Sequence, residues 1–78
     1  MTYFDGQKVC IGDRVRLAND QWRGIVVALI GEGEFFAGFC AEDWAHLGKG
    51  ALVDYDKVGL VHYDVIEQDV ELVGRAQR

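Results

Sequence analysis

Apolar and polar residues alternate in short stretches along this chain, and a period of two predicts β-strands. In GDRVRL, residues 12–17, the basic and apolar side chains separate cleanly, with Arg14 and Arg16 opposite Val15 and Leu17. A strand of this kind lies with one face in the core and the other in solvent. We expect a hairpin to precede it, because YFDGQKV carries the Asp-Gly turn signal between two β-prone runs.

The most apolar strand candidate is WRGIVVALI, residues 22–30, which follows a polar loop at residues 18–21. Both of its alternating faces are apolar: the pattern groups Ile25 with Val27 and Leu29, and Val26 with Ala28 and Ile30. A strand with two apolar faces needs a cover on each side. We therefore expect both faces of residues 22–30 to be covered.

Three more strands are predicted in the second half of the chain. ALVDYD and GLVHYD, residues 51–56 and 59–64, are close enough to form a hairpin with a tight turn between them. Alternation gives this hairpin an inner face of Val53, Tyr55, Val61 and Tyr63, and an outer face of Leu60, His62 and Asp64. A last strand is predicted at residues 70–73, and residues 75–78 are expected to fray.

One stretch, CAEDWAHLGKG at residues 40–50, has the spacing of a helix instead. Cys40, Trp44 and Leu47 stand at positions i, i+4 and i+7, which places them on one face. The opposite face carries Glu42, Asp43 and His46. A helix of two turns is marginal alone, so this short helix near residues 41–47 must dock its apolar face. Its expected targets are the second face of residues 22–30 or the open end of a barrel.

The composition fits one folded domain, residues 1–78. Half of the residues are hydrophobic and 12% are aromatic, which is typical of a globular core rather than of a disordered chain. The sequence shows no signal peptide and no apolar run of membrane-spanning length. Cys10 and Cys40 are too few for a disulfide scaffold, so we expect a reduced, cytoplasmic protein.

Charge is distributed unevenly along the chain. The formal net charge is −5, and residues 31–72 contain ten acids against only two bases, Lys49 and Lys57. An acidic surface repels phosphate backbones and disfavours general nucleic-acid binding. The acidic segment predicts either a protein partner with a basic surface or a face of solvated acids that serves solubility.

The segment from Ile11 to Leu29 resembles SH3-like barrels of the KOW and Tudor-like kind, with a Gly-Asp turn, an alternating strand, and Gly24 near the start of the next strand. This resemblance implies an all-β fold, a five-stranded SH3-like barrel. Nucleic-acid-binding members carry a basic loop where this chain has ANDQW, residues 18–22. Tudor-like members that read methylated lysine use an aromatic cage, which Trp22, Phe35, Phe36 and Tyr55 could supply.

A second resemblance concerns EDWAHLGKGALVDYDKVGLVHY, residues 42–63. This segment is similar in character to small acidic bacterial proteins of the cytosol that neutralise secreted toxins. The resemblance implies a stoichiometric, immunity-type inhibitor whose acidic face covers a basic surface of its partner.

Candidate chemistry is sparse. Zinc ligands come in close pairs, whereas Cys10, Cys40, His46 and His62 are scattered, so we expect no metal and no cofactor. A Cys–His nucleophile pair needs an activating environment and an orienting third group. Paired acids such as Glu32 and Glu34 are typical of solvated faces. The chain is therefore not expected to be an enzyme.

The sequence thus predicts a non-catalytic protein-binding module. The residues expected to contact its partner are Glu42, Asp43, Trp44, His46, Asp54, Asp56 and Trp22. The alternative is a nucleic-acid-associated KOW or Tudor-like domain that uses Arg14, Arg16 and Arg23. The choice between monomer and homodimer stays open, and no membrane association is expected.

Overall fold

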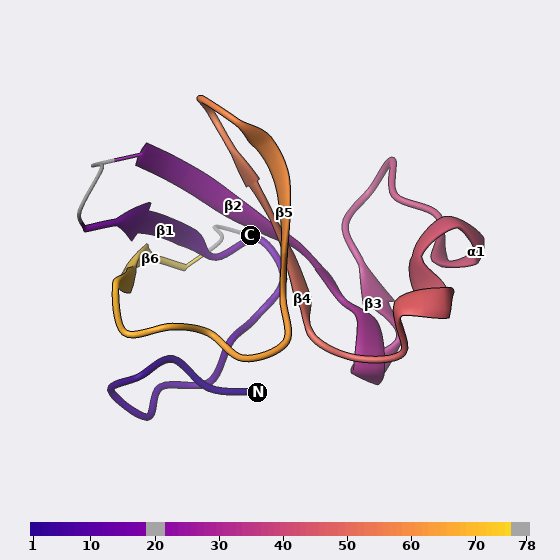
Figure 1. Ribbon diagram of the computed structural model, residues 1–78, viewed down its shortest axis with the longest axis horizontal. Coiled ribbons are helices and arrows are strands. Elements are labelled where there is room, and N and C mark those ends of the chain that lie inside the picture. Colours follow the sequence, from indigo (N-terminus) through magenta and orange to yellow (C-terminus); the bar gives the residue numbers. More distant parts are fainter. Residues whose placement is uncertain (19–21, 76–78) are drawn as a thin grey trace.

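A computed structural model describes residues 1–18 and 22–75 and shows an antiparallel β-sheet with one short helix (Figure 1). The all-β prediction is confirmed. The strands are β1 (Arg14–Leu17), β2 (Trp22–Leu29), β3 (Glu34–Phe35), β4 (Ala51–Tyr55), β5 (Gly59–Tyr63) and β6 (Val70–Gly74). The helical elements are α1 (Ala41–Trp44) and two 3-10 turns, η1 (Ile30–Glu32) and η2 (Ala45–Leu47). The predicted loop at 18–21 and the fraying of 75–78 fall mostly on residues 19–21 and 76–78, outside the described part.

The strands form one sheet in the order β5-β4-β2-β1-β6, and the two-residue strand β3 pairs with the end of β2. The sixth strand arises because the chain after β2 folds back on it for two residues, which alternation could not indicate. A closed barrel is not confirmed among the described residues, since β5 and β6 are the two ends of the sheet. Tyr3, Val9 and Ile66 lie outside the named strands and are also buried in the main core.

A β-bulge in β2 decides which side chains face which core. Val26 pairs with Val53, but the next pair is Ala28 with Leu52, so Val27 is the extra residue. Beyond the bulge, each side chain of β2 points to the face opposite to the one that regular alternation would give it. The alternation predicted for residues 25–30 is therefore wrong: Val26 and Leu29 enter the main core, whereas Val27, Ala28 and Ile30 enter a second one.

The main core lies on the concave side of the sheet and takes buried residues from β1, β2, β4, β5 and β6. The predicted inner face of the β4–β5 hairpin is confirmed, because Val53, Tyr55 and Tyr63 are buried there and Val61 packs against them. Gly24 has a packing role opposite this hairpin. A Cβ atom at this position would lie 2.7 Å from the ring of Tyr55, so a side chain there would force the two strands apart.

The N-terminal hairpin is confirmed, although its loop has three residues rather than two. Tyr3 accepts a hydrogen bond from the amide of Gly6 at 3.0 Å and donates one to Gln7 at 2.8 Å. Gly6 takes the positive φ of 93° that this loop requires. The Asp5 carboxylate accepts bonds from the Gln7 side chain and amide, and these bonds lower the pKa of Asp5.

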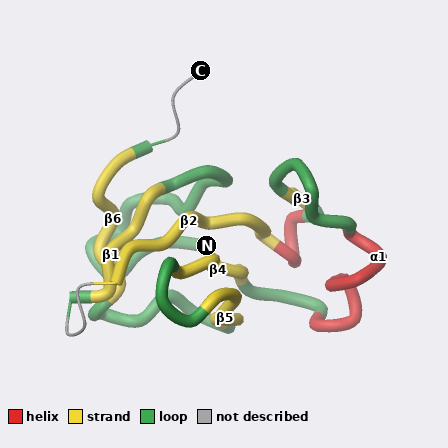
Figure 2. Tube along the Cα trace, turned by 90° about the horizontal axis from the view of Figure 1, so that it is seen from above, coloured by secondary structure: helices red, strands yellow, loops and turns green. Residues whose placement is uncertain are grey.

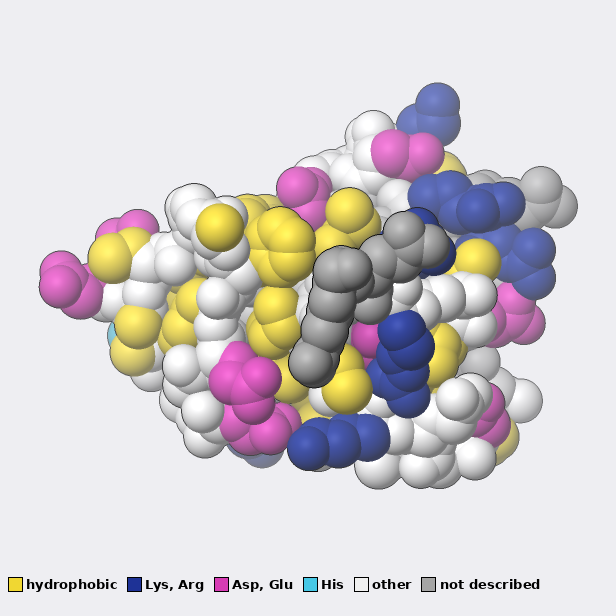
Figure 3. Space-filling view, turned by 180° about the vertical axis from the view of Figure 1, so that it is seen from behind, with side chains coloured by type: hydrophobic (Ala, Val, Ile, Leu, Met, Phe, Trp, Pro, Cys, Tyr) yellow, Lys and Arg dark blue, Asp and Glu magenta, His cyan; other side chains and the backbone are white. Residues whose placement is uncertain are grey.

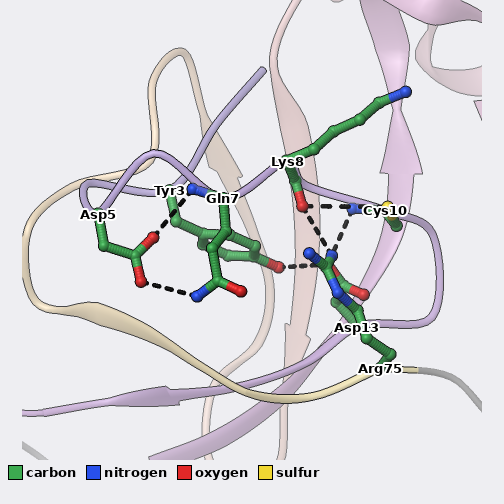
Figure 4. Close-up of polar contacts among 7 residues, drawn as sticks. All are labelled: Tyr3, Asp5, Gln7, Lys8, Cys10, Asp13 and Arg75. Atoms are coloured by element: carbon green, nitrogen blue, oxygen red, sulfur yellow. Dashed lines mark hydrogen bonds and ion pairs between the residues drawn. The ribbon is translucent and has the colours of Figure 1, made fainter.

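A buried carboxylate, that of Asp13, joins this hairpin to the start of β1 and to the residue after β6 (Figure 4). Its Oδ2 accepts hydrogen bonds from the Tyr3 hydroxyl at 2.7 Å, the Cys10 amide at 2.8 Å and the Arg75 guanidinium at 2.8 Å. Arg75 also donates to the carbonyl of Lys8 at 2.7 Å. One side chain thereby fixes the N-terminal hairpin, the entry to β1 and the residue after β6.

We predict that Asp13→Ala destabilises the protein by about 2–4 kcal/mol, since each buried donor left without an acceptor costs about 1–3 kcal/mol. The substitution leaves the Tyr3 hydroxyl and the Cys10 amide without their acceptor. Urea denaturation measures the change. The matched control is Glu71→Ala, which removes the exposed pair between Glu71 and Arg16 and is expected to cost less than about 1 kcal/mol. Equal losses in the two variants would contradict the role of Asp13.

The three tyrosines make stability depend on alkaline pH. Burial raises the pKa of Tyr3, Tyr55 and Tyr63. The bond to Asp13 raises the pKa of Tyr3 further, and the hydroxyls of Tyr55 and Tyr63 lie 2.8 Å apart. A raised pKa in the folded state gives stability that is complete below the unfolded pKa and is lost as pH rises toward the folded value.

We therefore predict a free energy of unfolding that is steady across neutral pH and falls above about pH 10, where unfolded tyrosine ionises. Urea denaturation from pH 7 to pH 11 measures it. Tyr3→Phe is expected to lower stability at pH 7, because the bond to Asp13 is lost, but to flatten the alkaline decline. A wild-type protein that keeps its full stability at pH 11 would contradict this prediction.

Candidate functional site

The segment between β2 and β4, residues 31–50, forms a lobe that stands to one side of the sheet (Figures 1 and 2). We call these residues the helical lobe. It rests on the second core, whose buried residues are Val27, Ala28, Ile30 and Leu52. Phe35, Phe39, Trp44 and Leu47 pack against this core from the lobe. Two backbone hydrogen bonds hold the lobe at its ends. The Phe36 amide donates to the Val27 carbonyl at 2.8 Å, and the Ile30 amide donates to the Gly50 carbonyl at 2.9 Å.

The predicted helix near residues 41–47 is confirmed in extent, but it tightens to a 3-10 turn after Trp44 and ends at Gly48. Trp44 and Leu47 are half-buried and cover the second core, as expected. Cys40 is exposed, so its assignment to the docked face was wrong. It precedes the first helical turn with an extended backbone, φ −102° and ψ 127°, and the i, i+4 relation to Trp44 therefore does not hold.

The outer surface of the helical lobe combines acids with an exposed aromatic ring. Four acids lie between residues 31 and 48, where there is no Lys or Arg: Glu32, Glu34, Glu42 and Asp43. All four are exposed, and within the described chain their only ion pair joins Glu32 to the N-terminal amine at 3.9 Å. Phe36 is 41% exposed on the same lobe, so the lobe offers an apolar contact as well as negative charge.

The predicted partner-binding residues fall into two groups. Glu42, Asp43, Trp44 and His46 lie together in the helical lobe. Asp54, Asp56 and Trp22 lie at the far end of the β2–β4 ladder, where the Asp56 amide donates to the Arg23 carbonyl at 2.9 Å. Five residues separate Ala51 from Asp56, which at about 3.3 Å per residue is roughly 16 Å. The expected continuity between the two acidic groups is therefore absent.

The possible aromatic cage is not assembled either. Trp22 is half-buried with its ring centroid 6.4 Å from that of Tyr55, and Tyr55 is only 3% exposed. Phe35 and Phe36 lie in the helical lobe, beyond the opposite end of β2. A cage needs several exposed rings around one cation, and these four rings do not share a surface.

The arginines expected for nucleic-acid binding do share a face of the sheet. Arg16 lies directly opposite Arg23, and Arg14 lies opposite Ile25. On the face seen in Figure 3, Lys and Arg side chains gather toward one end of the molecule, while hydrophobic side chains occupy the middle. A groove of about 450 Å³ runs between Arg14 and Arg23 over a floor that includes Ile25 and Val73. Sequence reasoning missed this groove, because Val73 lies far from Ile25 along the chain.

No group of three His, Cys, Asp or Glu side chains that could hold a metal ion occurs among the described residues. Cys10 and Cys40 are free thiols. His62 bonds to the Lys49 carbonyl at 2.9 Å, and His46 is exposed in the helical lobe. The expectations that the protein binds no metal or cofactor and is not an enzyme remain predictions.

Comparison with protein-family models, with curated proteins and with solved structures found no match to this chain. Within residues 1–18 and 22–75, no helix is long and apolar enough to cross a membrane. The function must therefore be argued from the surfaces described above.

We predict that Trp44→Ala destabilises the protein by about 1–3 kcal/mol, below the cost of deleting a fully buried tryptophan because the ring is half-exposed. Thermal and urea denaturation measure the change. Phe36→Ala is the matched control, and as an exposed position it is expected to cost about 0.5 kcal/mol or less. An unchanged melting temperature for Trp44→Ala would show that the ring does not hold the lobe on the second core.

Proposed function

We propose that this protein is a non-catalytic binding module that uses the helical lobe to cover a basic surface of a protein partner. In its most specific form it is a stoichiometric inhibitor of the immunity type. The observation that carries the proposal is the composition of the lobe surface: four exposed acids against one base, Lys49 near its end, together with the exposed ring of Phe36. Negatively charged side chains attract a basic partner, and an aromatic ring can anchor it.

The attachment of the lobe to the sheet supports this role. Trp44 and Leu47 pack on the second core, and the backbone bonds of Phe36 and Ile30 tie the lobe to β2 and to the start of β4. A surface that is held before binding loses less conformational entropy when the partner arrives. The charge on the lobe is therefore presented in a defined arrangement.

The resemblances named above support the remaining parts of the proposal. For the architecture we propose an SH3-like barrel, supported by a strand order in which β6 returns beside β1 and by a core that draws on five strands. The similarity of residues 42–63 to bacterial toxin-neutralising proteins, together with two free thiols, supports a bacterial, cytoplasmic inhibitor.

A second candidate function is nucleic-acid association through Arg14, Arg16 and Arg23, which occupy one face of β1 and β2. Nearby acidic side chains partly neutralise the charge of these arginines. Glu71 holds Arg16 in an ion pair at 2.6 Å, and Asp56 lines the groove beside Arg14 and Arg23. Phosphate binding requires an excess of positive charge, so we rank this function below protein binding.

The test is a charge reversal in the helical lobe, Glu42→Lys with Asp43→Lys. The probe is a labelled synthetic peptide of alternating lysine and leucine, and the measurement is its association rate at low and physiological salt. Wild-type protein is expected to bind, and the reversal to slow association by about tenfold or more. Stability should change by less than about 0.5 kcal/mol per site, because both acids are exposed.

The matched control is Asp64→Lys with Glu67→Lys, which makes the same change in net charge outside the lobe. This control is expected to bind the peptide nearly as fast as wild type. Equal slowing in the two variants would show that only net charge matters and would remove the lobe from the proposal. Salt-sensitive binding of a 20-base-pair DNA that Arg14→Glu abolishes would favour the second candidate.

A further inference from the structure

The edge of β5 is an unpaired strand edge. On one side Gly59–Tyr63 pairs with β4 over five residues without a bulge, and on the other side β5 ends the sheet. Beyond the ladder to β4, residues 59–63 make no backbone hydrogen bonds with the described part of the chain. The outward backbone groups of β5 are thus available to another strand.

The devices that usually protect a strand edge are missing from β5. Its sequence, GLVHY, contains no Pro and no Lys, and its pairing is regular. The opposite end of the sheet differs, because β6 pairs with β1 through a shifted register and is followed by Arg75, which is held by Asp13. Among the strand edges, β5 is therefore the one prepared for pairing.

Antiparallel pairing of two β5 strands about a two-fold axis has one favourable register. Centring the pair on Val61 sets Leu60 opposite His62 and Gly59 opposite Tyr63, so that all five residues of each strand are paired. Sliding by two residues in one direction leaves only residues 59–61 of each β5 opposite one another, because residues 56–58 form the turn before the strand. Sliding in the other direction leaves only residues 61–63 of each β5 opposite one another.

In the Val61-centred register the side chains are also complementary. Leu60, 40% exposed, would lie diagonally across the two-fold axis from Leu60 of the second copy, within reach of an apolar contact. This exposed apolar side chain of each copy would then be partly covered in the pair.

We propose that two copies of this chain associate through β5, edge to edge and antiparallel, to form one continuous sheet. The interface is isologous, since each copy offers the same strand, and main-chain hydrogen bonds join the copies as in other strand additions. The proposal does not depend on the proposed function, because β5 contributes no residue to the helical lobe.

The first test measures molar mass by light scattering and by sedimentation over a range of concentrations. Wild-type protein is expected to approach twice 8.7 kDa, and Leu60→Lys, which places a charge on the edge, to remain at the mass of one chain. Ile25→Lys is the matched control, because Ile25 is 42% exposed on the same sheet but away from β5; it should dimerise like wild type. A wild-type monomer at all concentrations, or equal behaviour of the two variants, overturns the proposal.

The second test addresses the register. In a background of Cys10→Ser and Cys40→Ser, Val61→Cys brings two thiols together at the two-fold axis, where opposed Cα atoms lie about 4.5–5.5 Å apart, within disulfide range. Mild oxidation is expected to yield a cross-linked dimer. Val65→Cys, exposed but four residues away from the axis, should remain uncross-linked. Equally rapid cross-linking of both variants overturns the antiparallel register.

Discussion

The carboxylate of Asp13 is the interaction on which the arrangement of the chain ends depends. It is completely buried, and an isolated charge in that position would be strongly unfavourable. Three donors make the position tolerable: those of Cys10 and Tyr3, 3 and 10 residues before it, and that of Arg75, 62 residues after it. This polar contact holds the N-terminal hairpin, the start of β1 and the residue after β6 together.

The bulge in β2 has a comparable influence on the helical lobe. Because Val27 is inserted between the pairs of Val26 and Ala28, Val27, Ala28 and Ile30 all face the second core. Under strict alternation Ala28 and Ile30 would instead share the face of Val26, and the second core would lose part of its floor. The surface that we assign to partner binding thus originates in a local irregularity of the central strand.

The short helix and the strands other than β3 could be predicted from the sequence because each depends on local alternation or on helical spacing. The inner face of the β4–β5 hairpin followed from this pattern, and so did the covering role of Trp44 and Leu47. The faces to which residues 25–30 point could not be predicted, since a bulge does not change the pattern of a run of apolar residues. The role of Asp13 was missed for a different reason: its partners are up to 62 residues away. The separation of Asp56 from Asp43 depends on strand direction, which charge counting ignores.

The two cores differ in size, and we expect the smaller one to open independently of the larger one. The second core contains only four buried residues, whereas the main core unites eleven from almost the whole chain. Cooperative units of a protein open with free energies that follow their buried contacts. The amides of the helical lobe should therefore exchange with solvent through local openings that leave the β2–β4 ladder closed, and they should lose their protection before the amides of the sheet.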